Sequence, residues 1–293
     1  MDQKDWEMLG ILAEEKNITQ TAKKLFFSQP TLSGKIKHLE KEFNCKIIIR
    51  GTRGISFTVQ GEILIRYAAQ AQMKFRELKE HLNNTNQEIC GTLHIGCSYL
   101  ISKYILPPLL KDFLKIYPQV NFQLKTAMSQ DVFNMINNRQ LQIGILRGDY
   151  NWSGEKCLLQ EDPICIISAT PLALEDLPKL PQIHRSLDKP LQSAINSWWQ
   201  TQYKEAPYIH MNVDTQESCL QLVSEGLGYT ILSELVCNDY PSLCCHRLQF
   251  PDGSLLTRKT HAYIHSEASE NQLIRAFYNF LISTSPELPN PSC

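Results

Sequence analysis

The segment from Asn17 to Gly61 limits the possible folds of this chain most strongly, because it predicts two short amphipathic helices followed by a basic hairpin. Thr19 is the predicted cap of the first helix. The expected apolar face of that helix consists of Ile18, Ala22, Leu25 and Phe26. Ser28 is the predicted cap of the second helix, and Pro30 is tolerated in its opening turn, where backbone N–H groups have no helical partner. The expected buried stripe of the second helix consists of Leu32, Ile36, Leu39 and Phe43.

The opposite face of the second helix mixes amide, hydroxyl and basic side chains. It consists of Gln29, Thr31, Ser33, Lys35, Lys37 and His38. Amides and hydroxyls suit base edges in a major groove, and lysines suit phosphates. Residues 16–66 hold ten Lys and Arg against three acidic residues, although the whole chain has a net charge of −1. A basic module within a neutral chain indicates DNA binding, with a solvated helix surface as the alternative.

The run AKKLFFSQPTLSGKIKHLEKEF, with Arg50, Arg53, Gly54 and the sequence Phe57-Thr58-x-x-Gly61 after it, resembles the winged helix-turn-helix of LysR-type transcriptional regulators. Gly34 departs from the family, which has a long polar residue there, and costs about 1 kcal/mol of helix propensity. Ile47-Ile48-Ile49 replaces the usual Leu-Phe pair. The predicted DNA-binding residues are Thr19, Ser28, Gln29, Pro30, Thr31, Ser33, Lys35, Lys37, Arg50 and Arg53.

A single long helix is predicted from Thr58 to about Gln87. Its apolar positions recur every three or four residues, at Val59, Ile63, Tyr67, Ala71, Phe75, Leu78 and Leu82. A rod of about 45 Å without a globular core to lie on is expected to pack against a second copy. The alternative is a core helix of a larger domain. In the family that the chain resembles, this helix is the dimerisation element.

From Thr92 onward, predicted strands alternate with predicted helices, which favours an α/β fold with ligands at the carboxyl ends of the strands. The resemblance implies two α/β lobes like those of a periplasmic binding protein, with chain crossings near Glu161 and Ser266. Between the strands of the second lobe we expect a long polar region containing Trp198-Trp199. The predicted domains are 1–58 (winged helix-turn-helix), 59–88 (linker helix) and 89–293 (effector-binding), with lobe I at 89–160 and 267–293 and lobe II at 161–266.

Several loops are expected to meet in a cleft between the lobes. Ser98 precedes a helix whose free N–H groups favour an anion, although Leu100 replaces the second hydroxyl common in the family. Arg147 follows a strand and can hold a carboxylate or phosphate, unless it forms a surface ion pair with Asp149 or Glu155. No acid of lobe I is expected to neutralise Arg147. The predicted effector-binding residues are Cys97, Ser98, Tyr99, Leu100, Ser129, Gln130, Arg147, Glu217, Ser218 and Gln221.

Catalytic and metal-binding motifs are not found in the sequence. It contains no glycine-rich phosphate loop, no G-x-S-x-G elbow and no H-E-x-x-H motif, so neither an enzyme nor a cofactor is predicted. The ten cysteines include no C-x-x-C pair, and their spacing with the eight histidines does not match a zinc site. Cys97, at a helix start, is one candidate for redox chemistry, and Cys237, Cys244 and Cys245 together are another.

Together with these observations, the resemblance implies a bacterial transcriptional regulator in which a small organic anion shifts the two lobes and changes binding to an inverted-repeat operator. The predicted partners are double-stranded DNA, the effector, a second copy in a homodimer or homotetramer, and RNA polymerase if the regulator activates. No signal peptide, membrane span or lipidation motif is found, which favours the cytoplasm and no membrane partner. One alternative is a thiol-based redox regulator, and another is a small-molecule-binding protein or enzyme without DNA function.

Overall fold

The N-terminal domain consists of three helices and a hairpin. The computed structural model of the chain describes residues 1–51, 54–83, 89–266 and 271–284. The elements of this domain are α1 (Gln3–Glu15), α2 (Ile18–Lys24), α3 (Gln29–Glu42), β1 (Ile48–Gly51) and β2 (Gly54–Phe57). Leu32, Ile36 and Leu39 of α3 are fully buried against the other helices, as their spacing predicted. The Ser28 hydroxyl caps α3 by accepting a hydrogen bond from the N–H of Thr31 at 3.2 Å.

Three details of this domain differ from the sequence-based prediction. Asn17, one position outside the helix, caps α2 by accepting hydrogen bonds from the N–H groups of Thr19 (2.9 Å) and Gln20 (3.1 Å), so the predicted cap at Thr19 is wrong. Phe26 lies beyond the end of α2 with φ of 55°, which turns its ring outward and leaves it 96% exposed. Phe43 follows the last turn of α3 and is 42% exposed.

The hairpin is joined to the long helix α4 (Val59–Asn83) by a tight connection. Thr58 precedes the helix, and its Oγ1 accepts a hydrogen bond from the N–H of Gly61 at 2.9 Å. A Cβ atom at Gly61 would lie 2.1 Å from the carbonyl oxygen of Ile47, so this close approach of the two backbones requires glycine. The sequence Phe57-Thr58-x-x-Gly61 therefore fixes how α4 leaves the winged domain.

Helix α4 presents apolar residues on two faces. Leu64, Ile65 and Ala68 are buried in the core of the N-terminal domain, so the expectation that this helix has no core to lie on is wrong for one face. The other face carries an apolar stripe that remains exposed. It consists of Val59 (71% exposed), Ile63 (55%), Tyr67 (60%) and Leu78 (54%). The side chain of Leu82 and residues 84–88 of the predicted linker lie outside the described part of the chain.

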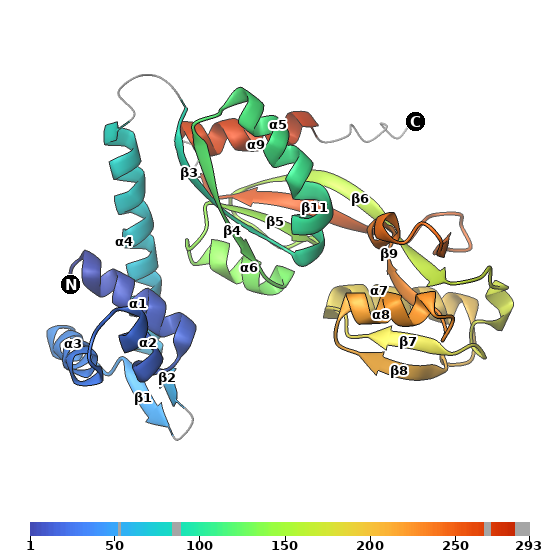
Figure 1. Cartoon of the computed structure of the whole chain (residues 1–293), viewed down its shortest axis with the longest axis horizontal. Coiled ribbons are helices and arrows are strands. Elements are labelled where there is room, and N and C mark those ends of the chain that lie inside the picture. Colours follow the sequence, from blue (N-terminus) through green and yellow to red (C-terminus); the bar gives the residue numbers. More distant parts are fainter. Residues whose placement is uncertain (52–53, 84–88, 267–270, 285–293) are drawn as a thin grey trace.

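Lobe I is a three-layer α/β unit (Figure 1). Its elements are β3 (Gly91–Cys97), η1 (Ile101–Ile105), α5 (Leu106–Ile116), β4 (Val120–Thr126), α6 (Ser129–Asn137), β5 (Ile143–Arg147), the first half of β6 (Glu155–Ser168), β11 (Thr257–Ile264) and α9 (Gln272–Thr284). Strands β4, β3 and β5 are parallel, whereas β11 runs antiparallel between β5 and β6. Phe113 of α5 and Phe277 of α9 pack on one face of the sheet, and Val132 and Ile136 of α6 pack on the other.

Lobe II is built on the second half of β6. Its other elements are η2 (Leu174–Asp176), β7 (Gln182–Arg185), α7 (Lys189–Gln202), β8 (Ile209–Val213), α8 (Gln216–Ser224), β9 (Thr230–Ser233), η3 (Glu234–Asp239) and β10 (Cys244–Arg247). The stretch around Trp198 and Trp199, predicted to be a polar region, is instead helix α7, in which both indoles are buried. Its start signals were present in the sequence, since Asp188 caps the helix and Pro190 lies in its first turn.

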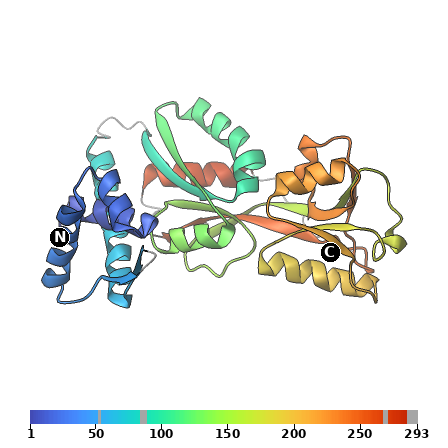
Figure 2. The same ribbon diagram turned by 60° about the horizontal axis from the view of Figure 1, so that its bottom comes forward.

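Two long strands connect the lobes, and Figure 2 shows the N-terminal domain, lobe I and lobe II in a row. Strand β6 pairs with β11 up to Pro163 and with β9 from Ile164 onward, so the chain enters lobe II close to the predicted crossing at Glu161. The predicted return near Ser266 is wrong. Strand β11 pairs with β5 of lobe I over residues 260–264, so the chain has already returned near Thr257.

Candidate functional site

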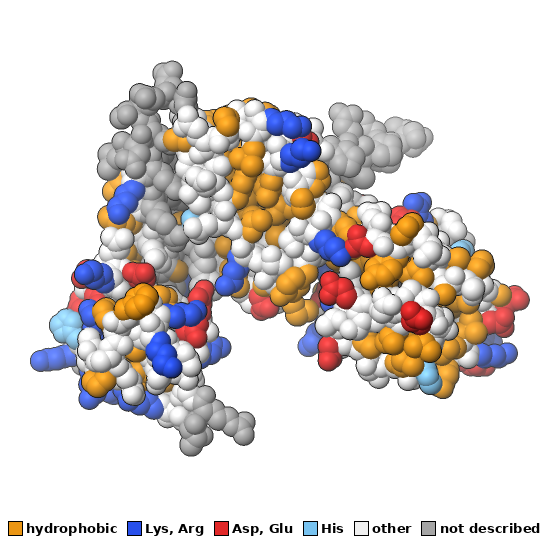
Figure 3. Space-filling model, in the orientation of Figure 1, with side chains coloured by type: hydrophobic (Ala, Val, Ile, Leu, Met, Phe, Trp, Pro, Cys, Tyr) orange, Lys and Arg blue, Asp and Glu red, His pale blue; other side chains and the backbone are white. Residues whose placement is uncertain are grey.

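The exposed surface of α3 and the hairpin carries the side chains predicted to contact DNA. The exposed residues are Thr19 of α2, Ser28, Gln29, Pro30 and Thr31 at the start of α3, and Lys37 further along the same helix. Arg50 of β1 extends toward α3, where its Nη2 donates a hydrogen bond to the hydroxyl of Ser33 at 3.3 Å. Lysine and arginine side chains gather on the visible face of this domain (Figure 3). Arg53 lies outside the described residues.

The two lysines predicted as phosphate contacts do not occupy equivalent positions. Lys35 is half-buried, with its Nζ 3.9 Å from the Asp5 carboxylate and 5.8 Å from the centroid of the Phe27 ring. Residues two apart on a helix face different directions, so Lys35 points back toward α1 whereas Lys37 remains exposed. The geometry therefore supports Lys37 as a phosphate contact and does not support Lys35.

A cleft of about 400 Å³ lies between the two lobes. Six of the predicted effector-binding residues line it, namely Ser98, Tyr99, Leu100, Ser129, Arg147 and Glu217. The prediction missed most of the lobe II wall, which includes Arg185, Ser186, Leu187, Asp188, Asp214 and Thr215, and it also missed Lys103, Tyr104, Ser233 and Arg258. Asp188 and Thr215 were detectable as helix caps, because each side chain accepts a hydrogen bond from the start of the helix that follows it.

Four predicted effector-binding residues do not line the cleft. The side chain of Cys97 is fully buried in the core of lobe I, and Gln130 is exposed on α6, where its amide bonds Asn134. Ser218 accepts a hydrogen bond from the hydroxyl of Thr215, and Gln221 bonds Glu225 one turn further along α8. Sequence placed these residues in the correct elements but could not determine the direction of their side chains.

Arg147 is buried where β5 ends, and its Nη2 forms a short ion pair with Oδ2 of Asp162. Both side chains are about 5% exposed. The alternative of a surface ion pair with Asp149 or Glu155 is wrong, since Asp149 pairs with Lys156 and Glu155 with Arg275. The expectation of an unneutralised guanidinium is also wrong, because the strand crossing between the lobes supplies an acid. Burial lowers the pKa of Arg147 to about 10 and raises that of Asp162 above its usual range.

Among the described residues, several buried polar atoms around Arg147 have no hydrogen-bond partner. Within the described part of the chain, Nε of Arg147, Nε of Arg258 and Oγ of Ser98 are buried without a hydrogen-bond partner. The same holds for Oδ1 of Asp162, whose other oxygen accepts from the Ser233 hydroxyl at 2.5 Å. Buried polar atoms are costly to leave unpaired, so an acceptor-rich ligand in the cleft would satisfy several donors at once.

Both walls of the cleft are tied together by polar contacts. Asp239 of lobe II accepts hydrogen bonds from Lys103 and from the hydroxyl of Tyr104, each at 2.6 Å. Arg258 donates to Asp188 at 2.5 Å and to the carbonyl of Arg147 at 3.1 Å. Because the bonds of Asp239 and the bond between Arg258 and Asp188 join side chains of different lobes, a ligand that displaced or reinforced them would change the relative position of the lobes.

Comparison with known proteins identifies the domains. The family described as LysR substrate binding domain matches residues 86–285, and the bacterial regulatory helix-turn-helix protein, lysR family, matches residues 4–62. The chain belongs to the LysR family of transcriptional regulators. This LysR regulator is 37% identical, over 96% of its length and 97% of the relative's, to the uncharacterized HTH-type transcriptional regulator YraN of Bacillus subtilis.

Two solved structures share the fold of this LysR regulator. Full-length CbnR in complex with its target DNA superposes with a TM-score of 0.69 at 17% identity, covering 97% of this chain and 100% of that one. Full-length OxyR of Pseudomonas aeruginosa superposes with a TM-score of 0.69 at 15% identity, covering 100% and 99%. The family assignment makes the chain a DNA-binding transcriptional regulator rather than an enzyme. Among its described residues, no helix combines the length and apolarity that crossing a membrane requires.

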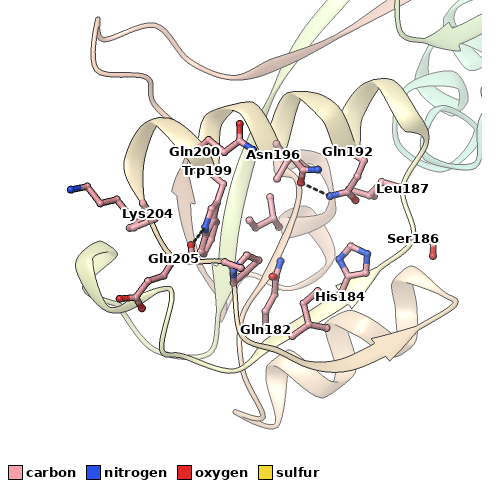
Figure 4. Close-up of a pocket in the computed structure, with 16 residues that line it drawn as sticks. Gln182, His184, Ser186, Leu187, Gln192, Asn196, Trp199, Gln200, Lys204 and Glu205 are labelled. Atoms are coloured by element: carbon pink, nitrogen blue, oxygen red, sulfur yellow. Dashed lines mark hydrogen bonds between the residues drawn. The ribbon is translucent and has the colours of Figure 1, made fainter.

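A second, larger pocket of about 670 Å³ lies entirely within lobe II of this LysR regulator, between α7 and the β7–β8 pair (Figure 4). Its walls are rich in amides, including Gln182, Gln192 and Asn196, and Trp199 forms an aromatic surface. The indole of Trp199 donates to the carbonyl of Glu205 at 2.8 Å, which fixes the ring. Of these two pockets in the described part of the chain, the smaller cleft is the one lined by both lobes, so it can sense their relative position directly.

The cysteine predictions have different outcomes in the structure of this LysR regulator. Burial raises the pKa of the Cys97 thiol to about 11, which opposes the predicted activation at a helix start. In the other candidate group, Cys245 lies close to Cys237 but the third neighbour is Cys165, not Cys244. The neighbouring thiols of Cys165 and Cys237 lower the pKa of Cys245 below its usual range.

Proposed function

We propose that this LysR regulator acts in the cytoplasm as a homodimer, or as a homotetramer, that binds an inverted-repeat operator. Helix α3 would enter the major groove, with Gln29, Thr31 and Ser33 at base edges and with Lys37 and Arg50 at phosphates. The exposure of Gln29, Thr31, Lys37 and Arg50 supports this arrangement, and Ser33 is partly exposed. RNA polymerase is a further partner if the regulator activates transcription.

The proposed dimer contact is the exposed stripe of α4. Val59, Ile63, Tyr67 and Leu78 are each more than half exposed, although all are large apolar residues. Their spacing of three or four residues, continued through Ala71 and Lys74, places them along one side of the helix. A second copy of α4 would bury this stripe and hold the two DNA-binding domains at a fixed separation.

Replacing Ile63 by aspartate is expected to dissociate the dimer, because each association would then bury two charges in an apolar seam. Light scattering on the full chain measures the result as a halving of the particle mass. Ile209→Asp is the matched control, since it introduces the same change at an exposed isoleucine of lobe II (45% exposed, against 55% for Ile63). An unchanged mass for Ile63→Asp would assign dimerisation to another surface.

The effector that fits the inter-lobe cleft is a small organic anion that also carries hydrogen-bond donors. The unpaired donors of Ser98, Arg147 and Arg258 on the cleft wall carry this proposal, because they favour a carboxylate or phosphate. Asp214 and Glu217 line the opposite wall and favour hydroxyl or amino groups on the same ligand. Binding would stabilise one arrangement of the lobes and thereby change how the two DNA-binding domains of the dimer contact the operator.

Replacing Ser98 by alanine is expected to weaken effector binding by about tenfold without destabilising the free protein. The hydroxyl is buried and unpaired, so its removal costs the protein no hydrogen bond, whereas the ligand loses one of about 1.5 kcal/mol. A thermal-shift screen with small carboxylates and phosphates identifies a ligand, and calorimetry then measures the loss of affinity.

Ser102→Ala is the control, because the Ser102 hydroxyl already bonds the carbonyl of Tyr99 at 2.8 Å and does not line the cleft. A screen in which only cations or uncharged compounds stabilise the protein would contradict the proposed chemistry. A ligand that strongly changes Trp199 fluorescence and binds Ser98→Ala normally would instead occupy the lobe II pocket.

A further inference from the structure

Three cysteines that are distant in sequence lie together in lobe II, and none of them lines the cleft or the pocket of Figure 4. Cys165 lies on β6, Cys237 on η3 and Cys245 on β10. The Sγ atoms of Cys165 and Cys245 lie within 4.8 Å of each other, and the side chain of Cys237 lies beside that of Cys245. Cys165 is fully buried, Cys237 is half-buried and Cys245 is exposed, so the group extends from the core of the lobe to its surface.

The strand register explains why these cysteines converge. In the antiparallel β6–β10 ladder, Cys165 lies opposite Arg247 and Cys245 lies opposite Ile167. Residues two apart on a strand share a face, so the side chains of Cys165 and Cys245 are on the same side of the sheet. That side faces η3, which brings Cys237. Cys244 lies one residue earlier, opposite Ser168, and therefore belongs to the other side.

A carboxylate completes the group. Glu234 begins η3, and one of its oxygens lies within 4.8 Å of both Cys165 Sγ and Cys245 Sγ, which are themselves within 4.8 Å of each other. A tetrahedral zinc site with Zn–S bonds of about 2.3 Å separates its ligand atoms by about 3.8 Å. Small side-chain rotations therefore suffice to bring these atoms to such a geometry.

We propose that Cys165, Cys245 and Glu234, whose ligand atoms already converge, form a binding site for a thiophilic divalent metal ion of the zinc class, with the neighbouring thiol of Cys237 turning inward as the fourth ligand. Thiolate ligands select soft or borderline metals over magnesium and calcium, and three convergent ligands with one further thiol beside them suit the tetrahedral preference of zinc. Glu234 also accepts two hydrogen bonds from Arg247, at 2.8 and 3.0 Å. A carboxylate has enough lone pairs to retain Arg247 while one oxygen binds the ion, and the guanidinium offsets part of the ligands' negative charge.

The site is placed to influence the effector domain. Its ligands Glu234 and Cys237 belong to η3, which also carries Asp239, the residue that bonds Lys103 and Tyr104 of lobe I. Glu234 directly follows Ser233, whose hydroxyl bonds Asp162 beside Arg147. A bound ion would therefore fix the segment through which lobe II contacts the cleft and the opposite lobe.

Cobalt(II) is the direct probe, because tetrahedral cobalt bound by thiolates gives intense visible bands and a sulfur-to-metal charge-transfer band. Reduced, untagged full-length protein is titrated with Co²⁺, and then Zn²⁺ is added to displace it. We expect one equivalent of Co²⁺ per chain, a charge-transfer band of several thiolates, and complete displacement by one equivalent of Zn²⁺.

The exposed ligand gives the cleanest variant. Cys245→Ser is expected to lower the affinity for Zn²⁺ by more than about 100-fold, since even the loss of an indirect partner costs 10- to 100-fold. Cys237→Ser tests the third thiol with the same expectation. Cys244→Ser is the matched control, because the neighbouring thiol lies on the other side of the strand, and it should bind normally. Circular dichroism verifies that each variant is folded.

Three results would overturn the proposal. The first is a cobalt spectrum without thiolate charge transfer. The second is an equal loss of affinity in Cys244→Ser and Cys245→Ser. The third is a stable disulfide among these cysteines in the purified protein, detected by thiol titration and mass spectrometry, that re-forms in preference to metal binding. That result would make the group a redox switch instead of a metal site.

Discussion

Replacing Asp162 by alanine is expected to lower the free energy of unfolding of the effector domain by about 3–5 kcal/mol. The substitution leaves the Arg147 guanidinium buried without its ion-pair partner and also removes the acceptor of the Ser233 hydroxyl. Urea unfolding of the full chain measures the change, with a corresponding drop in Tm of roughly 10 °C. The substitution should destabilise both lobes, because Asp162 lies where β6 crosses from one lobe to the other.

The control is Asp149→Ala, which breaks an exposed ion pair with Lys156 and should cost less than about 1 kcal/mol. The double variant Arg147→Met/Asp162→Ala removes both buried charges and should recover part of the loss, because an apolar replacement of a buried pair is often tolerated. If Asp162→Ala is as stable as the wild type, the buried pair described here does not contribute to folding.

Replacing Lys37 by glutamate is expected to weaken operator binding by about 60-fold at 0.1 M salt and to reduce the salt-dependence slope by about two. Both values follow if Lys37 makes one phosphate contact in each DNA-binding domain of a dimer, because each contact contributes about 0.9 to the slope. Lys37 is exposed on α3 and its charge is free to meet DNA, unlike that of Lys35. Fluorescence anisotropy at several salt concentrations measures both quantities, on operator and on random DNA.

Two comparisons show whether the effect is specific. Lys111→Glu makes the same change of charge on lobe I. It should leave the salt-dependence slope unchanged, because the slope depends on side chains that contact phosphates and not on the net charge of the protein. Gln29→Ala should instead reduce discrimination between operator and random DNA by about 1–3 kcal/mol per half-site. Equal losses on both DNAs for Gln29→Ala and Lys37→Glu would mean that base and phosphate contacts are wrongly assigned.

Local patterns in the sequence were sufficient to predict most of the architecture. The spacing of Leu32, Ile36 and Leu39 identified the buried face of α3, and alternating strands and helices identified the α/β lobes. The similarity of AKKLFFSQPTLSGKIKHLEKEF to the LysR family was confirmed by the family matches over residues 4–62 and 86–285. Such signals are readable because periodicity, caps and turns depend on residues near one another in the chain.

Side-chain partners could not be predicted in the same way, because they depend on residues far apart in sequence. Asp149 and Glu155 are the acidic residues near Arg147 in the sequence, but strand pairing placed Asp162 beside it. Lys35 and Lys37 look equivalent in sequence, yet packing of α3 on α1 turned only one of them inward.

The cysteines and the cleft show most clearly what the sequence determined and what the tertiary structure decided. By itself the sequence determined that ten cysteines exist and that no short metal-binding motif connects them. The antiparallel register of β6 and β10 decided that Cys165 and Cys245 share a face and that Cys244 does not. Likewise, the lobe II wall of the cleft was decided by how α7 and α8 pack against the sheet. Local sequence sets which elements form, whereas burial and strand register set which side chains meet, and only the folded chain satisfies both conditions at once.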